Sequence, residues 1–153
     1  MPLQLAAAVR PFEPAVEGLE AELRVSIPSD VAYIEEAVEL VARYLDTSFA
    51  DRRTVRFNLR VALAEALANA IVYGNAEDTT KRVGVRALFG RNAAHVEVTD
   101  EGRGFDYRCQ PDPTVPFARM QPRGRGLFLI RALVDEVRFN SLGNSICMIL
   151  RRD

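Results

Sequence analysis

The sequence predicts an α+β fold: a two-layer sandwich in which a mostly antiparallel mixed sheet carries helices on one face. Three observations predict it. Several short segments alternate apolar and polar residues with the period of a half-buried strand, and others repeat apolar residues at helical spacing. Neighbouring strand-like segments are joined by short glycine-containing turns, which are typical of antiparallel pairs.

Length and composition set further bounds. A chain of 153 residues with 48% hydrophobic content is long enough for one domain with a substantial core. Its formal charge of -1 favours protein or small-molecule partners over direct nucleic-acid or membrane binding. The two cysteines, Cys109 and Cys147, lie far apart and His95 is the only histidine, so no disulfide framework or zinc site is predicted. No apolar run approaches the roughly 20 residues of a membrane span, and we expect a cytoplasmic protein.

The chain divides into a short leader and one domain. We expect residues 1–20 to form a flexible leader, because the apolar run near their start lacks the features of a secretory signal. The domain is expected over residues 21–153. Its first strand is predicted over 21–27, where apolar and polar residues alternate until Pro28 ends the pattern.

Two helices follow in the sequence pattern. Ser29 or Asp30 is placed to cap a helix over 31–45, whose apolar residues recur at helical spacing. A second helix is predicted over about 51–73, and Gly74-Asn75 is a pair suited to a left-handed helix end.

The second half of the chain is mostly strand. A hairpin is predicted over 82–99 with its turn at 90–92. Residues 101–123 hold four prolines and no sustained period, and we interpret them as a lid loop. A helix over about 126–134 follows. Strands over 136–141 and 145–151, joined by a turn at Gly143-Asn144, complete the domain.

Glu65 and Asn69 are the first residues with a chemical signal. They lie four residues apart and so share one face of the predicted helix. The carboxylate could accept a proton from an attacking hydroxyl, and the amide oxygen could complete the shell of a phosphate-bound Mg²⁺. A solvated helix edge is the alternative from spacing alone.

Two glycine-rich segments come later in the chain. Asp100 ends a strand pattern and precedes Gly102 and Gly104, so its carboxylate could reach a pocket and accept from an exocyclic amine, although an ordinary turn has the same composition. The run at 123–126, with Arg123, Gly124, Arg125 and Gly126, would offer backbone donors and guanidinium groups to phosphates, or act as a hinge.

Taken in order, these segments resemble the GHKL ATP-binding superfamily, and within it the bacterial anti-sigma-factor serine/threonine kinases. The resemblance covers about residues 21–151. Glu65 and Asn69 match the N box, Asp100 to Gly104 the first glycine box, and Gly124 with Gly126 the second. The stretch 131–139 also resembles the segment that follows the second box in these kinases.

The resemblance implies a Bergerat-type fold that binds ATP and Mg²⁺. It implies that Asp100 holds adenine, Asn69 ligates Mg²⁺ and Glu65 acts as general base, with phosphates near Arg123. The chain departs from the pattern where Tyr73 replaces a frequent histidine. It departs again where the closing Gly-Thr is replaced by Gly143-Asn144-Ser145, so that Asn144 or Ser145 would contact adenine.

Three functions follow from this resemblance. The leading one is a Mg-ATP-dependent serine/threonine protein kinase that sequesters a sigma factor, phosphorylates an anti-anti-sigma (STAS-type) protein and forms a homodimer. The second is a nucleotide-responsive binding module that transfers no phosphate. The third is a histidine-kinase-type catalytic domain acting on a separate acceptor chain, although the only histidine, His95, lies in a strand pattern.

Overall fold

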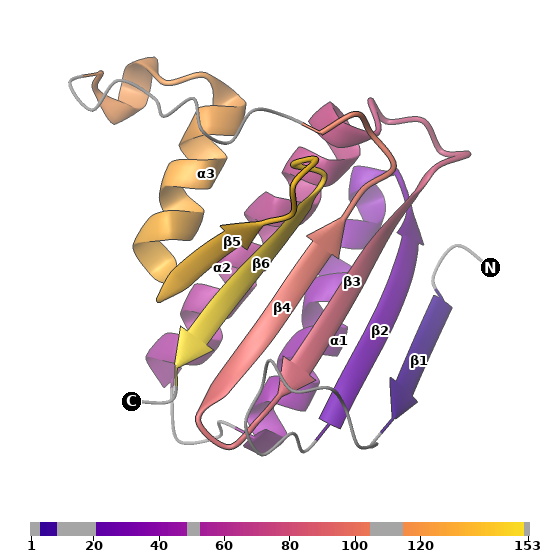
Figure 1. Ribbon diagram of the computed structural model, residues 1–153, viewed down its shortest axis with the longest axis vertical. Coiled ribbons are helices and arrows are strands. Elements are labelled where there is room, and N and C mark those ends of the chain that lie inside the picture. Colours follow the sequence, from indigo (N-terminus) through magenta and orange to yellow (C-terminus); the bar gives the residue numbers. More distant parts are fainter. Residues whose placement is uncertain (1–3, 9–20, 49–52, 105–114, 152–153) are drawn as a thin grey trace.

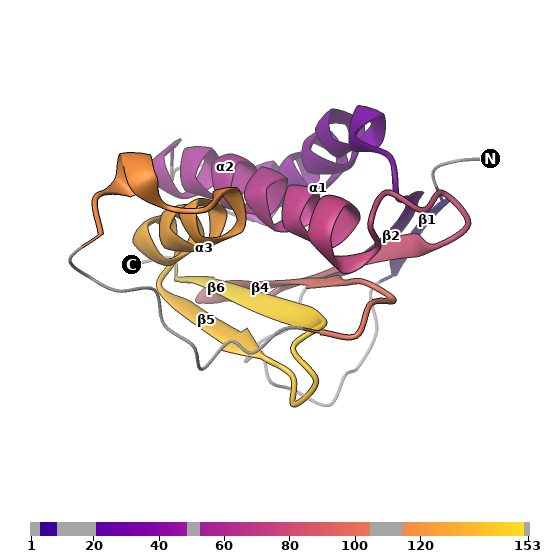
Figure 2. The same cartoon turned by 90° about the horizontal axis from the view of Figure 1, so that it is seen from above.

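The computed structural model describes residues 4–8, 21–48, 53–104 and 115–151. These residues form two layers: a six-stranded sheet in the order β1-β2-β3-β4-β6-β5, with the helices packed on one of its faces (Figures 1 and 2). Every strand pairing in this part of the chain is antiparallel. The predicted α+β sandwich is therefore confirmed, with a sheet that is antiparallel throughout its described extent. The strands are β1 Gln4–Ala8, β2 Ala21–Pro28, β3 Arg82–Phe89, β4 Ala93–Thr99, β5 Glu136–Phe139 and β6 Ser145–Arg151.

The edge strand β1 was not predicted. It pairs with β2 in antiparallel register, with Leu5 opposite Val25, although the sequence pattern left these residues in the leader. A run of apolar residues without alternation carries no strand period, so only the pairing reveals the strand. The β3–β4 hairpin is confirmed, and its turn is closed by a hydrogen bond from Gly90 N to Ala93 O of 2.9 Å.

The first helical segment begins at the capping residue Asp30. Its Oδ1 accepts from Ala32 N at 2.9 Å, and its backbone is extended, as in an ordinary N-cap. A 3₁₀ turn, Val31–Tyr33, leads into α1, Ile34–Ser48. Ser29, the other candidate cap, instead donates its hydroxyl to Lys81 O at 2.8 Å.

The second helix ends differently from the prediction. Helix α2, Arg53–Asn69, continues into a wider π-helical turn, Ala70–Gly74, in which Asn75 N donates to Ala70 O at 2.8 Å. The left-handed geometry expected at Gly74-Asn75 is wrong, because Asn75 has φ -99° and the positive φ angles fall at Ala76 and Glu77. π turns of this kind are frequent at functional sites.

Helix α3, Pro122–Leu133, begins four residues before its predicted start. Proline is well placed at the first helical position because its missing N–H needs no acceptor there. Of the predicted lid, residues 105–114 lie outside the described part of the chain, and a 3₁₀ turn, Phe117–Arg119, precedes α3.

The core lies between the two layers as one apolar cluster of buried residues. Helix α1 packs over β2 and β3, α2 over β4 and β6, and α3 beside β5. Among the described helices none is long and apolar enough to cross a membrane. Helices α2 and α3 thus lie side by side above the β4, β5 and β6 end of the sheet (Figure 2).

Candidate functional site

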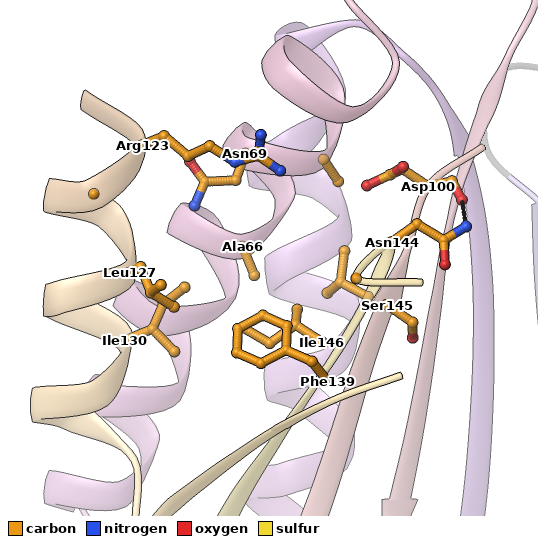
Figure 3. Close-up of a pocket in the computed structure, with 14 residues that line it drawn as sticks. Ala66, Asn69, Asp100, Arg123, Leu127, Ile130, Phe139, Asn144, Ser145 and Ile146 are labelled. Carbon is orange, nitrogen blue, oxygen red and sulfur yellow. Dashed lines mark hydrogen bonds between the residues drawn. The ribbon is translucent and has the colours of Figure 1, made fainter. Parts of the chain in front are cut away.

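A cavity of about 220 Å³ lies between α2, α3 and the strands β4, β5 and β6 (Figure 3). Its floor is apolar and its rim is polar. Figure 3 shows Asp100 and Asn144 on one side of the cavity and Asn69 and Arg123 on the other. The lining residues are Ala66, Asn69, Ala70, Val98, Asp100, Arg123, Gly124, Leu127, Ile130, Phe139, Gly143, Asn144, Ser145 and Ile146. An apolar pocket with a few convergent polar groups is the usual form of a small-molecule site.

Asp100 follows β4 and is fixed by hydrogen bonds to Asn144 and to Gly102. Its N–H donates to Asn144 O at 2.9 Å, and Asn144 Nδ2 donates to Asp100 O at 3.0 Å. Gly102 N donates to Asp100 Oδ1 at 2.7 Å. Burial raises the pKa of the Asp100 carboxyl above its usual 3.8, against the opposing effects of the Gly102 N–H and of Arg123.

Glycines make room for the Asp100 carboxylate. A Cβ on Gly74 would lie 2.3 Å from Asp100 Cγ, so the last residue of the π turn must lack a side chain. A Cβ on Gly102 would lie 2.2 Å from Gly74 O, and Gly104 has φ +82°. Glycine is therefore required at position 74 because the Asp100 carboxylate approaches it closely. It is not required by a left-handed backbone, which the sequence had predicted there.

Glu65 and Asn69 lie where α2 meets α3. The Cβ that Gly126 lacks would sit 2.9 Å from Glu65 Oε2 and 3.2 Å from Asn69 Nδ2. Gly126 thus lets α3 approach these two polar side chains closely. Asn69 lines the cavity, whereas Glu65 lies one helical turn away and does not.

The start of α3 brings two of its predicted residues to the cavity. Arg123 and Gly124 line it, and Gly124 N–H belongs to the first turn, where amides have no acceptor within the helix. The Arg123 guanidinium carbon lies 5.7 Å from the ring centroid of Tyr73. Burial lowers the pKa of Arg123, and Asp100 opposes that change. Arg125 instead lies against Phe117, 5.5 Å from its ring centroid.

Of the ten residues predicted for the site, the structure therefore brings five together at the cavity: Asn69, Asp100, Arg123, Gly124 and Ser145. Ser145 Oγ also shares a hydrogen bond of 2.7 Å with Thr99 Oγ1. The other five residues do not line the cavity. Of these, Glu65 and Gly126 face each other across α2 and α3, Gly102 and Gly104 shape the Asp100 loop, and Arg125 packs against Phe117.

Sequence reasoning missed the apolar floor. Leu127 and Ile130 lie three residues apart on α3, a spacing that could have indicated one helix face. Phe139 and Ile146 are register partners of β5 and β6, so they meet only once those strands pair. No short motif marks that pair.

The donor set suits a cation held mainly by phosphate. Within the part of the chain that the structure describes, no group of three or more His, Cys, Asp or Glu side chains could hold a metal ion. The Glu65 carboxylate and the Asn69 amide both lie close to Gly126 of α3. Mg²⁺ is commonly bound by one or two protein groups together with water and substrate phosphates, so these residues fit it.

The family model described as "Histidine kinase-like ATPase domain" matches residues 27–150, which contain the whole cavity. The chain belongs to this family. It is similar to the serine-protein kinase RsbW of Bacillus subtilis (strain 168), with 31% identity over 98 residues, 60% of this chain and 61% of that protein. It is also similar to the serine-protein kinase RsbW of Oceanobacillus iheyensis, with 28% identity over 131 residues, 78% of each chain. The aligned segment thus spans less than two thirds of the Bacillus subtilis relative.

Proposed function

We propose that the protein is a cytoplasmic Mg-ATP-dependent serine/threonine kinase that acts as an anti-sigma factor in a partner switch. The observation that carries the proposal is the convergence of Asn69, Asp100, Arg123, Gly124 and Ser145 on one apolar-floored cavity. The names of the two relatives support the kinase activity. Its partners would be a sigma factor and an anti-anti-sigma (STAS-type) protein, and the protein would act as a homodimer.

Each side of the cavity has a role in this proposal. The ionised Asp100 carboxylate accepts from the exocyclic amine of adenine, while Phe139 and Ile146 provide an apolar surface for the ring. Ser145 supplies a further hydroxyl for the base. The Gly124 N–H, the positive end of the α3 dipole and Arg123 receive the phosphates.

In phosphoryl transfer a serine oxygen of the partner attacks the γ-phosphorus. A new P–O bond forms, the bond to the β-phosphate oxygen breaks, and ADP leaves. Glu65 accepts the hydroxyl proton, and the Asn69 amide oxygen would hold Mg²⁺. The ion, when bound, neutralises phosphate charge. Partner binding is what would bring the hydroxyl to Glu65.

The first test is calorimetric titration of Mg-ATP and Mg-ADP into the wild type and Asp100→Asn. We expect saturable binding by the wild type and a loss of about tenfold or more in the variant, because an amide oxygen is a weaker acceptor than an ionised carboxylate. Asp78→Asn is the matched control, since Asp78 is an exposed turn carboxylate that bonds Thr80. Folded, nucleotide-free wild type that fails to bind either nucleotide would refute the proposal.

The second test separates kinase from binding module. Transfer of labelled γ-phosphate to a serine of a cognate anti-anti-sigma protein is expected, with loss on Glu65→Ala. The binding module is the second candidate, and the observation that favours it is that Glu65 does not line the cavity. It predicts that Glu65→Ala leaves partner binding and signalling intact. An acid-labile phosphohistidine on a partner would instead assign the histidine-kinase type of reaction.

A further inference from the structure

One buried amide joins three segments of the chain beside the cavity. Asn75 is only 1% exposed, directly after the π turn of α2. Its Nδ2 donates to Ser29 Oγ at 2.9 Å and to Arg82 O at 3.1 Å, and its Oδ1 accepts from Glu101 N at 2.8 Å. Both amide hydrogens and the carbonyl oxygen are therefore used.

The third of these bonds reaches the loop that carries Asp100, the residue proposed to contact the nucleobase. Glu101 is the residue after Asp100, so Asn75 fixes the peptide that leaves the Asp100 backbone. The same loop is held from the other side, where Asp100 N donates to Asn144 O at 2.9 Å. Glu101 Oε2 also accepts from Arg82 N, which anchors the loop to the start of β3.

The space between these anchors is tightly filled. A side chain on Gly74 would collide with the Asp100 carboxylate, and one on Gly102 would collide with Gly74 O. The Asp100 loop thus sits directly against the π turn. Asn75, the next residue after Gly74, joins the end of the π turn to the Asp100 loop through its hydrogen bond with Glu101 N.

We propose that Asn75 is a positioning residue for nucleobase recognition, acting through the Glu101 amide to hold the Asp100 carboxylate where an exocyclic amine can reach it. The inference rests on the proposed function, in which Asp100 binds adenine. Asn75 itself does not line the cavity. Its loss should therefore affect the discrimination between bases more than the binding of phosphates.

The test compares Mg-ATP with Mg-purine riboside triphosphate, which lacks the 6-amino group, by calorimetry. The wild type is expected to prefer ATP by about tenfold, the usual effect of one hydrogen bond to a charged group. Asn75→Ala should reduce that ratio to about twofold or less. Asn75→Asp keeps an acceptor oxygen for Glu101 N, so it should retain most of the preference while losing stability.

Leu45→Ala is the control for destabilisation alone. Leu45 is fully buried on α1 and does not line the cavity, so this variant should unfold more readily yet keep the wild-type ratio. If Asn75→Ala does not fold, Ser29→Ala removes one support of the amide and should lower the ratio about twofold.

The outcomes are distinct. Failure of the wild type to bind ATP, or equal binding of the two nucleotides, refutes the proposed role of the cavity or of Asp100. A wild-type preference that survives unchanged in Asn75→Ala, or in Ser29→Ala where the first variant is unfolded, overturns the role of Asn75 alone. Equal loss of preference in Asn75→Ala and Asn75→Asp also overturns it, because anchoring through Glu101 would then not be the cause.

Discussion

Helix α2 has a different neighbour on each side, and the two sides are packed in opposite ways. Towards α1, large apolar side chains fill the space above β2 and β3, and Tyr44 stacks 6.4 Å from Phe89. Towards α3, the small residues Ala66, Ala70 and Gly124 leave a cavity of about 220 Å³. Among the described residues, α1 contributes none to the lining of that cavity.

The difference separates stability from binding within one helix layer. The packed side chains beside α1 stabilise the fold, because their buried aliphatic groups are removed from water. The space beside α3 gives up part of that stabilisation and is available to a ligand. If the α1 side of α2 serves stability and the α3 side serves binding, the same substitution should lower stability on the α1 side and ligand binding on the α3 side.

The largest expected effect comes from adding the same side chain on both sides. Ala66→Leu places an isobutyl group at the cavity wall and should reduce Mg-ATP binding below detection in a protein that still folds. Ala37→Leu, at a fully buried α1 position, should cost about 1–3 kcal/mol of unfolding free energy by overpacking. Its dissociation constant should not change. Calorimetry and denaturant unfolding measure the two quantities, and loss of binding in both variants would contradict the division.

A smaller effect is expected from pH on the cavity side. Burial raises the pKa of Asp100 above 3.8, and the ionised carboxylate is the better acceptor. Affinity for adenosine, which carries no titrating phosphate, should therefore fall by up to about tenfold per pH unit as pH drops below that raised pKa.

Stability should respond to Asp100 in the opposite direction. The folded state holds the Asp100 proton more tightly than the unfolded state does, so the carboxyl contributes stability at acid pH. That contribution is lost as pH rises from 3.8 through the folded pKa. Asp100→Asn should remove both dependences, as checked by calorimetry and thermal unfolding across this window. Equal pH dependence in wild type and variant would assign the effect to another group.

The smallest effect is expected from a solvent-exposed ion pair between α1 and α2. Glu39 and Arg60 join α1 to α2 by an ion pair in which both side chains are well exposed. Glu39→Gln should change Tm by less than about 3 °C and leave nucleotide affinity unchanged, because solvent screens such pairs. Thermal unfolding at low and high salt is the measurement. A much larger shift would show that this pair contributes to the packing of α1 on α2.

The fold was largely predictable because its signals are local. Alternation marked the strands from 21 onward, and the Asp30 cap and helical spacing marked α1. The edge strand β1 lacked alternation. The need for glycine at position 74 comes from the close approach of the Asp100 carboxylate, which no local pattern encodes. Strand 136–141 proved shorter, ending at Phe139, because Asn140 uses its side chain to close the following turn.

The site was predictable only in part for the same reason. Asp100, Asn69 and Gly124 stand in short motifs, and they meet at the cavity. The apolar floor comes from residues on separate strands, whose meeting depends on register. Asn75 was interpreted as a helix end, whereas its burial and its three partners appear only when β2, β3 and the Asp100 loop are assembled.

The pairing of Phe139 with Ile146 has a consequence for the order of events during folding. Both residues line the cavity, and they are brought together by β5 and β6, the last strands that the structure describes. Helix α2, which forms part of the opposite wall, comes from residues far earlier in the chain, so closing the site requires long-range contacts. During synthesis the earlier segments would emerge first, and ATP could not help them fold. Nucleotide should therefore stabilise the finished domain by mass action without accelerating the earliest steps of folding.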